Sequence, residues 1–160
     1  MTSRRTITPV PYSAVEMFDL VADVESYPDF LPHCVALRIL SQDVDDGAGT
    51  LTAEMVVAYG AFRERFKSCV RLDRASRTIE ASYLDGPFRK LYNFWRFVDM
   101  PGGSEVDFTI DFEFRSLFLQ AAAATVFERA FEKMSDAFII RAEEVYGTVA
   151  RTRGETNAGA

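Results

Sequence analysis

Apolar and polar residues follow a helical period near the end of the chain. Residues 117–146 contain no proline or glycine, and apolar side chains recur there at intervals of three or four residues. These side chains are Phe127, Phe131, Met134, Phe138, Ala142 and Val145. Such spacing places them on one face of a helix. The pattern predicts a helix over residues 117–146, about 45 Å long, that ends with Gly147 as its C-cap.

A two-residue alternation dominates the chain before this helix and predicts β-strands. It is plainest in residues 105–114, where apolar residues share one parity and mostly acidic residues take the other. The predicted strands cover residues 4–10, 34–40, 50–59, 62–72, 78–83, 88–98 and 105–114. Short turns rich in Gly, Pro and Asp separate the last six, including an acidic turn over residues 42–49. Such short connections predict an antiparallel sheet.

A helical segment interrupts the strands early in the chain. Ser13 and Glu16 form a capping-box pattern, which predicts a helix over residues 14–23. Residues 25–32 (ESYPDFLP) follow, and their two prolines predict that this segment is not a regular helix. The segment carries Tyr27, Phe30 and Leu31. We interpret it as a core plug or as a lid over a cavity.

Only the C-terminal helix is large enough to cover the apolar face of the predicted sheet. The sequence therefore predicts a single α+β domain in which a curved antiparallel sheet wraps around one long helix. We place this domain in residues 1–147. The remaining residues, 148–160, are mostly small and polar, and we expect a disordered tail.

Composition narrows the possible functions. The chain has 18 basic and 24 acidic residues, a net charge of −6, which argues against nonspecific nucleic-acid binding through the whole surface. Its two cysteines lack metal-ligand spacing, and we expect both to be reduced thiols. No apolar run reaches the roughly 18 residues of a membrane span. We expect a cytoplasmic protein, peripheral to the inner membrane at most.

Catalytic motifs are missing from the sequence. It has no nucleophile elbow, phosphate loop, dinucleotide fingerprint or zinc motif, so we expect no catalytic residue and no metal. We interpret the single histidine, His33, as a surface or cap residue. Four basic residues share one face of the strand over residues 62–72: Arg63, Arg65, Lys67 and Arg71. They fit a solvated convex face, or a patch for RNA or anionic lipid.

The number of large apolar residues that point between sheet and helix is unusual, since Phe alone occurs 14 times. Two interpretations remain open: a solid core, or an apolar cavity for a flat or prenylated lipophile. Asn93 is the candidate polar contact in such a cavity. The candidate ligand-binding residues are Tyr27, Phe30, Leu31, Phe62, Phe66, Tyr83, Asn93, Trp95, Phe97, Phe108, Phe112, Phe127, Phe131, Met134 and Phe138.

Three stretches occur in a characteristic order: DVESYPDFLPHC (23–34), DGPFRKLYNFWRF (85–97) and VDFTIDFEFRSLF (106–118). Together they resemble the coenzyme Q-binding START-like family over residues 3–147. This family includes mitochondrial coenzyme Q-binding proteins and bacterial relatives described as polyketide cyclase-like or as a ribosome-association toxin. Because the predicted fold begins within ten residues of Met1, we expect a bacterial member without a transit peptide.

The resemblance implies a helix-grip (START/Bet v 1-like) fold with a seven-stranded sheet. It also implies that ubiquinone, or another prenylated or hydrophobic small molecule, binds between sheet and helix without catalysis and without a further cofactor. The family's alternative function is to bind the large ribosomal subunit and block subunit joining. Polyketide cyclisation is a third possibility, and the lack of an acid/base pair argues against it.

Overall fold

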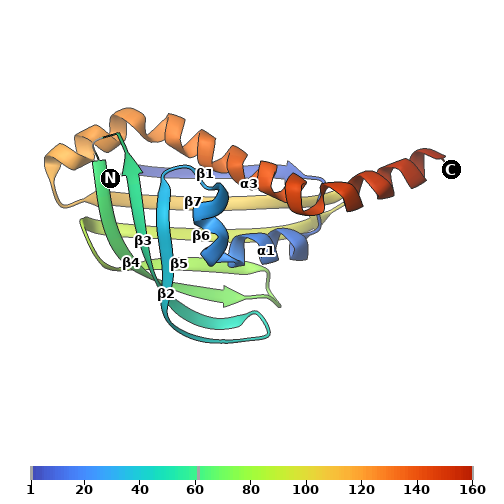
Figure 1. Cartoon of the computed structure of the whole chain (residues 1–160), viewed down its shortest axis with the longest axis horizontal. Helices are drawn as coiled ribbons and strands as arrows, with labels where there is room; N and C mark the ends of the chain where they lie inside the picture. The colour runs from blue at the N-terminus through green and yellow to red at the C-terminus, as the bar shows by residue number, and fades with distance from the viewer. Residues whose placement is uncertain (1, 61, 160) are drawn as a thin grey trace.

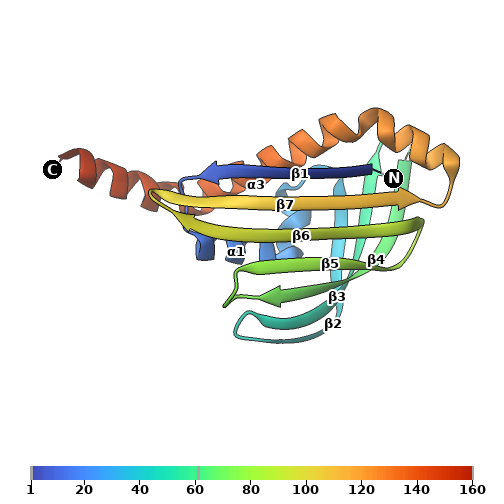
Figure 2. The same ribbon diagram turned by 180° about the vertical axis from the view of Figure 1, so that it is seen from behind.

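The computed structural model describes residues 2–60 and 62–159, with side chains described up to residue 147. Seven strands and a long C-terminal helix make up most of the fold (Figures 1 and 2). The elements are β1 (Thr2–Val10), α1 (Ala14–Ala22), the 3-10 helix η1 (Val24–Ser26), α2 (Tyr27–Phe30), β2 (Cys34–Asp45), β3 (Ala48–Tyr59), β4 (Phe62–Asp73), β5 (Thr78–Asp85), β6 (Phe88–Met100), β7 (Gly103–Phe114) and α3 (Leu117–Gly159).

The strands form one antiparallel sheet in the order β1-β7-β6-β5-β4-β3-β2. Its strands bend strongly, and α3 runs across the concave side and projects beyond the sheet near the C-terminus (Figure 1). The first and last strands pair with each other, from Thr2 opposite Phe112 to Val10 opposite Ser104. The predicted seven-stranded α+β helix-grip fold is confirmed.

The strand ends differ from the prediction at the acidic turn. Residues 42–45, predicted as turn, belong to β2, and Ser41, Gln42 and Asp43 pair with β3. Asp46 and Gly47 both have positive φ angles, 51° and 75°. Two such residues make a tight hairpin turn whose twist matches that of the flanking strands. The sheet is therefore longer at this end than the polar residues of this segment indicate.

The helix α1 begins as predicted, with a complete capping box. The Ser13 hydroxyl accepts from the Glu16 amide, and the Glu16 carboxylate accepts from the Ser13 amide, at 3.1 and 2.9 Å. As predicted, α1 does not continue through residues 25–32, since it ends at Ala22. The segment is less irregular than predicted, because η1 and the short helix α2 lie there. Pro28 occupies the first turn of α2, where the missing proline amide would have had no helical partner.

The helix α3 begins at the predicted residue, where the Ser116 hydroxyl accepts from the Leu119 amide. The prediction that it ends at Tyr146 with Gly147 as C-cap was wrong, because its backbone continues to Gly159. Glycine within a helix is unfavourable by only about 1 kcal/mol relative to alanine, and Gly147 is buried. The division into a domain and a tail stays a prediction, and the side chains of residues 148–160 lie outside the described part.

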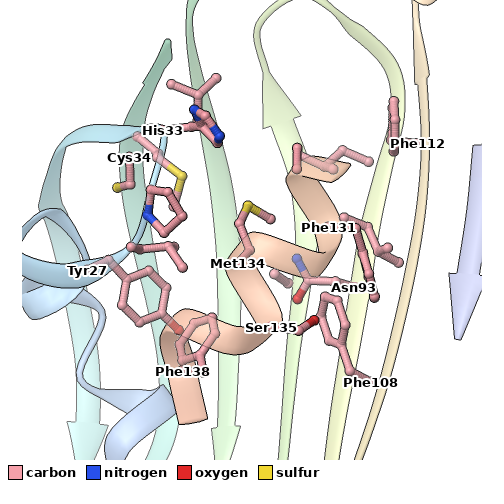
Figure 3. A pocket seen from close by; sticks show the side chains of 18 of the residues that line it. Tyr27, His33, Cys34, Asn93, Phe108, Phe112, Phe131, Met134, Ser135 and Phe138 are labelled. Atoms are coloured by element: carbon pink, nitrogen blue, oxygen red, sulfur yellow. The ribbon is translucent and has the colours of Figure 1, made fainter. Parts of the chain in front are cut away.

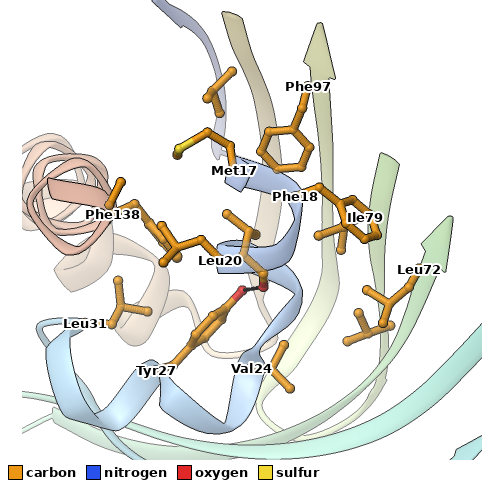
Figure 4. Close-up of a cluster of buried hydrophobic side chains, with 14 of the residues drawn as sticks. Met17, Phe18, Leu20, Val24, Tyr27, Leu31, Leu72, Ile79, Phe97 and Phe138 are labelled. Carbon is orange, nitrogen blue, oxygen red and sulfur yellow. Dashed lines mark hydrogen bonds between the residues drawn. The ribbon is translucent and has the colours of Figure 1, made fainter. Parts of the chain in front are cut away.

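Two groups of buried side chains lie at opposite ends of the space between sheet and α3. The larger group packs α1 and α2 against the sheet and the later turns of α3 (Figure 4). Met17, Phe18 and Val21 are among its largest fully buried side chains. The smaller group contains Phe88, Phe112 and Phe114. The space between the two groups is where the candidate site lies.

Candidate functional site

A cavity of about 480 Å³ separates the concave face of the sheet from α3. Figure 3 shows side chains from α2, β2, β6, β7 and α3 arranged around it. Its size lies within the range of pockets that hold small molecules, about 300–1,000 Å³. The interpretation as an apolar cavity, rather than a solid core, therefore fits the structure.

The sheet wall supports this conclusion independently. Trp95 on β6 and Phe108 on β7 point inward from central strands and are covered by α3, yet both are only half-buried. The same is true of Asn93 and Ile110, which are paired neighbours on those strands. Inward residues of a solid core would be buried like Phe18. Their accessible surface is therefore cavity surface.

The helix wall combines aromatic and small side chains. Phe127, Phe131 and Phe138 face the sheet, with Phe131 and Phe138 only 3% and 7% exposed. Between and before them α3 presents residues with little volume, which leave space above the sheet: Ala122, Ala123, Ala130 and Ser135. The alanine run at residues 121–124 is thus part of what makes the cavity.

Aromatic side chains line the two ends of the cavity. At the α2 end, Tyr27 packs edge-on against Phe138 with ring centroids 5.4 Å apart, and its hydroxyl donates to the Val21 carbonyl. At the other end Phe66 packs edge-on against Phe88, with centroids 5.3 Å apart. Gly86 precedes Phe88 with a φ of 142°, and a Cβ there would lie 2.7 Å from that of Phe66. The DGPF turn therefore needs glycine to seat Phe88.

An ion pair bridges the edge between β1 and α3. Arg4 lies on the inner face of β1, donates to Glu128 of α3, and places its guanidinium 5.2 Å from the centre of the Phe131 ring. Thr6 and Thr8 follow on the same face and line the cavity. This edge of the cavity is consequently more polar than the walls.

Polar groups inside the cavity are few and uncharged. No Asp, Glu, Lys or Arg lines it among the described residues. Asn93 and Ser135 project into it from β6 and α3, and neither side chain forms a hydrogen bond within the described part of the chain (Figure 3). Burial raises the pKa of the Cys34 thiol to about 11 and the pKa of the Tyr27 phenol still further. The wall suits a neutral, lipophilic ligand.

All but three of the predicted ligand-binding residues line the cavity. Phe97 lies behind its wall, 2% exposed and edge-on to Phe18. Tyr83 packs on Phe88 and accepts from its amide through the hydroxyl. Phe30 covers Phe138 from outside, with the Arg141 guanidinium over its ring. Ligand contact by any of the predicted residues stays a prediction.

His33 is the cavity residue whose position the sequence analysis missed. Predicted as a surface or cap residue, it lines the cavity beside Tyr59, with ring centroids 4.7 Å apart. Its Nδ1 lies 3.2 Å from the Ala58 carbonyl oxygen, and its Nε2 is buried without a partner in the described structure. In the sequence, the feature that could have indicated a place at the cavity wall was its position directly after the proline-bounded segment, residues 25–32.

The convex face of the sheet carries the charged residues. Glu54 is 8% exposed and lies between Arg38 and Arg65, at 3.2 and 3.9 Å. Arg63 and Arg71 are exposed and form no ion pair within the described residues. Of the four residues in the predicted basic row, Arg65 is therefore engaged by an acid, Arg63 and Arg71 face solvent, and Lys67 is half-buried.

Within the described residues, no group of three or more His, Cys, Asp or Glu is placed to hold a metal ion. No helix in this part of the chain has the length and apolar character needed to cross a membrane.

Curated relatives cover most of the chain. The ribosome association toxin RatA of Escherichia coli K12 is 37% identical over 138 residues, which are 86% of this chain and 84% of RatA. The mitochondrial coenzyme Q-binding protein COQ10 homolog B of Xenopus laevis is 31% identical over 141 residues, 85% of this chain and 56% of that protein.

Solved structures show the same fold. An 18 kDa protein of Caulobacter crescentus has a TM-score of 0.77 and 36% identity, covering 92% of this chain and 99% of that one. A START superfamily protein of Mycobacterium smegmatis has a TM-score of 0.75 at 20% identity, covering 89% and 98%. The family described as polyketide cyclase / dehydrase and lipid transport matches residues 10–139. The chain therefore belongs to the polyketide cyclase / dehydrase and lipid transport family.

Proposed function

We propose that this protein binds an uncharged, ring-bearing lipophile, a prenylated quinone such as ubiquinone, in the cavity and does not chemically alter it. The observation that carries the proposal is the half-buried state of Trp95 and Phe108 on the central strands under α3. An apolar ligand that covers this surface gains roughly 25 cal/mol of binding free energy for each Å² of apolar area that it removes from water.

The lining favours binding over catalysis. General acid/base chemistry needs a titratable group held by a partner that sets its protonation. No carboxylate, lysine or arginine lines the cavity among the described residues, so His33 has no acidic partner there. The raised pKa of the Cys34 thiol also disfavours the thiolate that nucleophilic catalysis would use.

The choice of a quinone rests on relatives and on shape. A relative 31% identical to this chain is named as a coenzyme Q-binding protein. Aromatic side chains suit a quinone ring, and the Trp95 and Phe108 rings lie on the cavity wall with Asn93, their centroids 4.1 Å apart and their planes tilted by 40°. The apolar ends of the cavity suit an isoprenoid tail.

Native mass spectrometry of the purified protein, followed by organic extraction and absorbance spectroscopy, tests the proposal. We expect a lipophile bound at one molecule per chain, with a quinone chromophore in the extract. A protein isolated from quinone-producing cells that carries no lipophile, and that takes up no added decylubiquinone, would contradict the proposal.

Ribosome association is the second candidate function. Relatives named as ribosome association toxins support it. Arg63 and Arg71 support it too, because they are exposed on the convex face and have no ion-pair partner among the described residues. Sedimentation with purified large ribosomal subunits tests it. The double variant R63E/R71E should lose co-sedimentation, while the matched charge reversal R129E/K133E on the exposed side of α3 should keep it. Equal sedimentation of both variants would contradict a role for this face.

A further inference from the structure

The backbone holds His33 in an uncommon conformation at the cavity wall. Its φ angle is 70°, in the left-handed region, directly after the segment that contains α2. Histidine adopts this region more readily than most residues, but the conformation is still less favourable than an extended one. Two hydrogen bonds secure it, because the Ala58 amide donates to the His33 carbonyl at 2.9 Å and the His33 ring meets the Ala58 carbonyl.

The Ala58 carbonyl determines which ring nitrogen carries the proton. A carbonyl oxygen only accepts hydrogen bonds, so the Nδ1 that lies 3.2 Å from it must donate. In the neutral imidazole the proton is then on Nδ1, and Nε2 keeps a lone pair. Nε2 is thus an acceptor, and it is buried without a donor among the described residues.

The surroundings supply no donor for this lone pair. Tyr59 is the neighbouring aromatic ring, tilted by 50° to the imidazole, and its hydroxyl makes no hydrogen bond to Nε2. Buried polar atoms in native proteins are nearly always paired, so an unpaired one on the wall of a cavity points to a group that arrives with a ligand.

We infer that the ligand donates a hydroxyl hydrogen bond to His33 Nε2, so the cavity selects a phenol or hydroquinone ring over the corresponding quinone. This inference rests on the proposed function. A quinone offers only carbonyl and ether oxygens, which are acceptors, and two acceptors cannot form a hydrogen bond. The pairing requires a small shift of the lining side chains around His33 as the ligand enters.

The preference should be about tenfold, because one additional hydrogen bond inside a protein contributes roughly that factor. For a quinone that is reduced by two electrons, a tenfold preference for the hydroquinone raises the potential of the bound couple by about 30 mV. The protein would then hold the reduced carrier more tightly than the oxidised one.

A pair of redox-inert probes tests the inference: 4-nonylphenol, which donates a hydrogen bond, and 4-nonylanisole, its methyl ether, which does not. Calorimetry should show the phenol binding about tenfold more tightly. His33 is the single histidine, so ¹⁵N-histidine labelling gives one pair of ring resonances. We expect the free protein to be protonated at Nδ1, and the Nε2 resonance to move with the phenol but not with the ether.

The variant His33→Asn keeps a residue that tolerates the left-handed conformation but removes Nε2. It should bind both probes equally, whereas the control Ser68→Ala, which removes a different polar group from the wall, should keep the preference. Tight and equal binding of both probes to the wild type, with Nε2 unmoved or already protonated, would overturn the inference and leave the proposed function standing. If neither probe binds and decylubiquinone does not bind either, the inference and the proposed function are both contradicted.

Discussion

Replacing Phe108 by alanine distinguishes a cavity from a solid core through its effect on stability. Phe108 points inward from β7, with the rings of Trp95 and Phe131 at 4.1 and 5.8 Å between centroids, and its remaining surface faces the cavity. Phe18 is the matched control, because it is 1% exposed and packs edge-on against Phe97, away from the cavity.

The expected magnitudes differ by about a factor of two. Removing a fully packed phenylalanine reduces the free energy of unfolding by about 3–5 kcal/mol, through lost transfer energy and a new void. We expect that loss for Phe18→Ala. Phe108 already borders a void on one side, so fewer contacts disappear, and we expect about 1.5–2.5 kcal/mol.

Urea denaturation of ligand-free protein, followed by far-UV circular dichroism, measures both losses. Circular dichroism is preferable to fluorescence because Phe108 contacts the single tryptophan. Equal losses of 3 kcal/mol or more for both variants, at unchanged denaturant dependence, would refute the argument that the surface of Phe108 faces a cavity.

Three further predictions concern other parts of the molecule. Ala123→Phe fills the helix wall and should weaken lipophile binding at least tenfold in a calorimetric titration, with little change in melting temperature, whereas Ala124→Phe on the exposed side of α3 should bind normally. The hydrogen bonds from Arg5 lower the pKa of Asp107 in the folded protein. The stability that they contribute is therefore present above the pKa of this carboxyl in the unfolded chain, about 4, and disappears as the pH falls through its pKa in the folded protein. Asp107→Asn should therefore be less stable than wild type at pH 7, and urea titrations at pH 3 should show a smaller difference; a constant difference would contradict this. Because the pKa of the Cys34 thiol is raised to about 11, mass spectrometry should show iodoacetamide modifying it far more slowly than free cysteine at pH 8.

Local pattern was enough to predict the fold. The alternation in β7 placed Val106, Phe108 and Phe112 on one face, and the structure has all three facing α3 or the core beneath it. Short hairpin connections predicted that neighbouring strands pair antiparallel, as they do in the sheet. The aromatic side chains of residues 127–138 predicted that α3 packs on this sheet. The errors lie where proline or glycine was expected to exclude or end a helix. Pro28 instead occupies the first turn of α2, and Gly147 lies within α3.

The cavity itself could not be derived in this way. A solid core and a cavity need the same inward aromatic residues, and the difference depends on how far α3 stands from the sheet. The alanines at positions 122 and 123 were a signal for that distance, but alanine is also an ordinary helix residue. His33 was missed because its position depends on Ala58, 25 residues away, whose carbonyl engages Nδ1. Nε2 is then left buried at the wall of a cavity that only the folded chain creates.

Titration of Trp95 fluorescence with decylubiquinone tests the central claim most directly. Trp95 is the single tryptophan, lies on the cavity wall and is half-buried there. A quinone stacked beside the indole should quench it saturably, with one molecule bound per chain, and Ala123→Phe should shift the curve to higher concentration. Quenching that rises linearly without saturation, as for free N-acetyltryptophanamide, and equally in wild type and Ala123→Phe, would contradict a lipophile site between the sheet and α3.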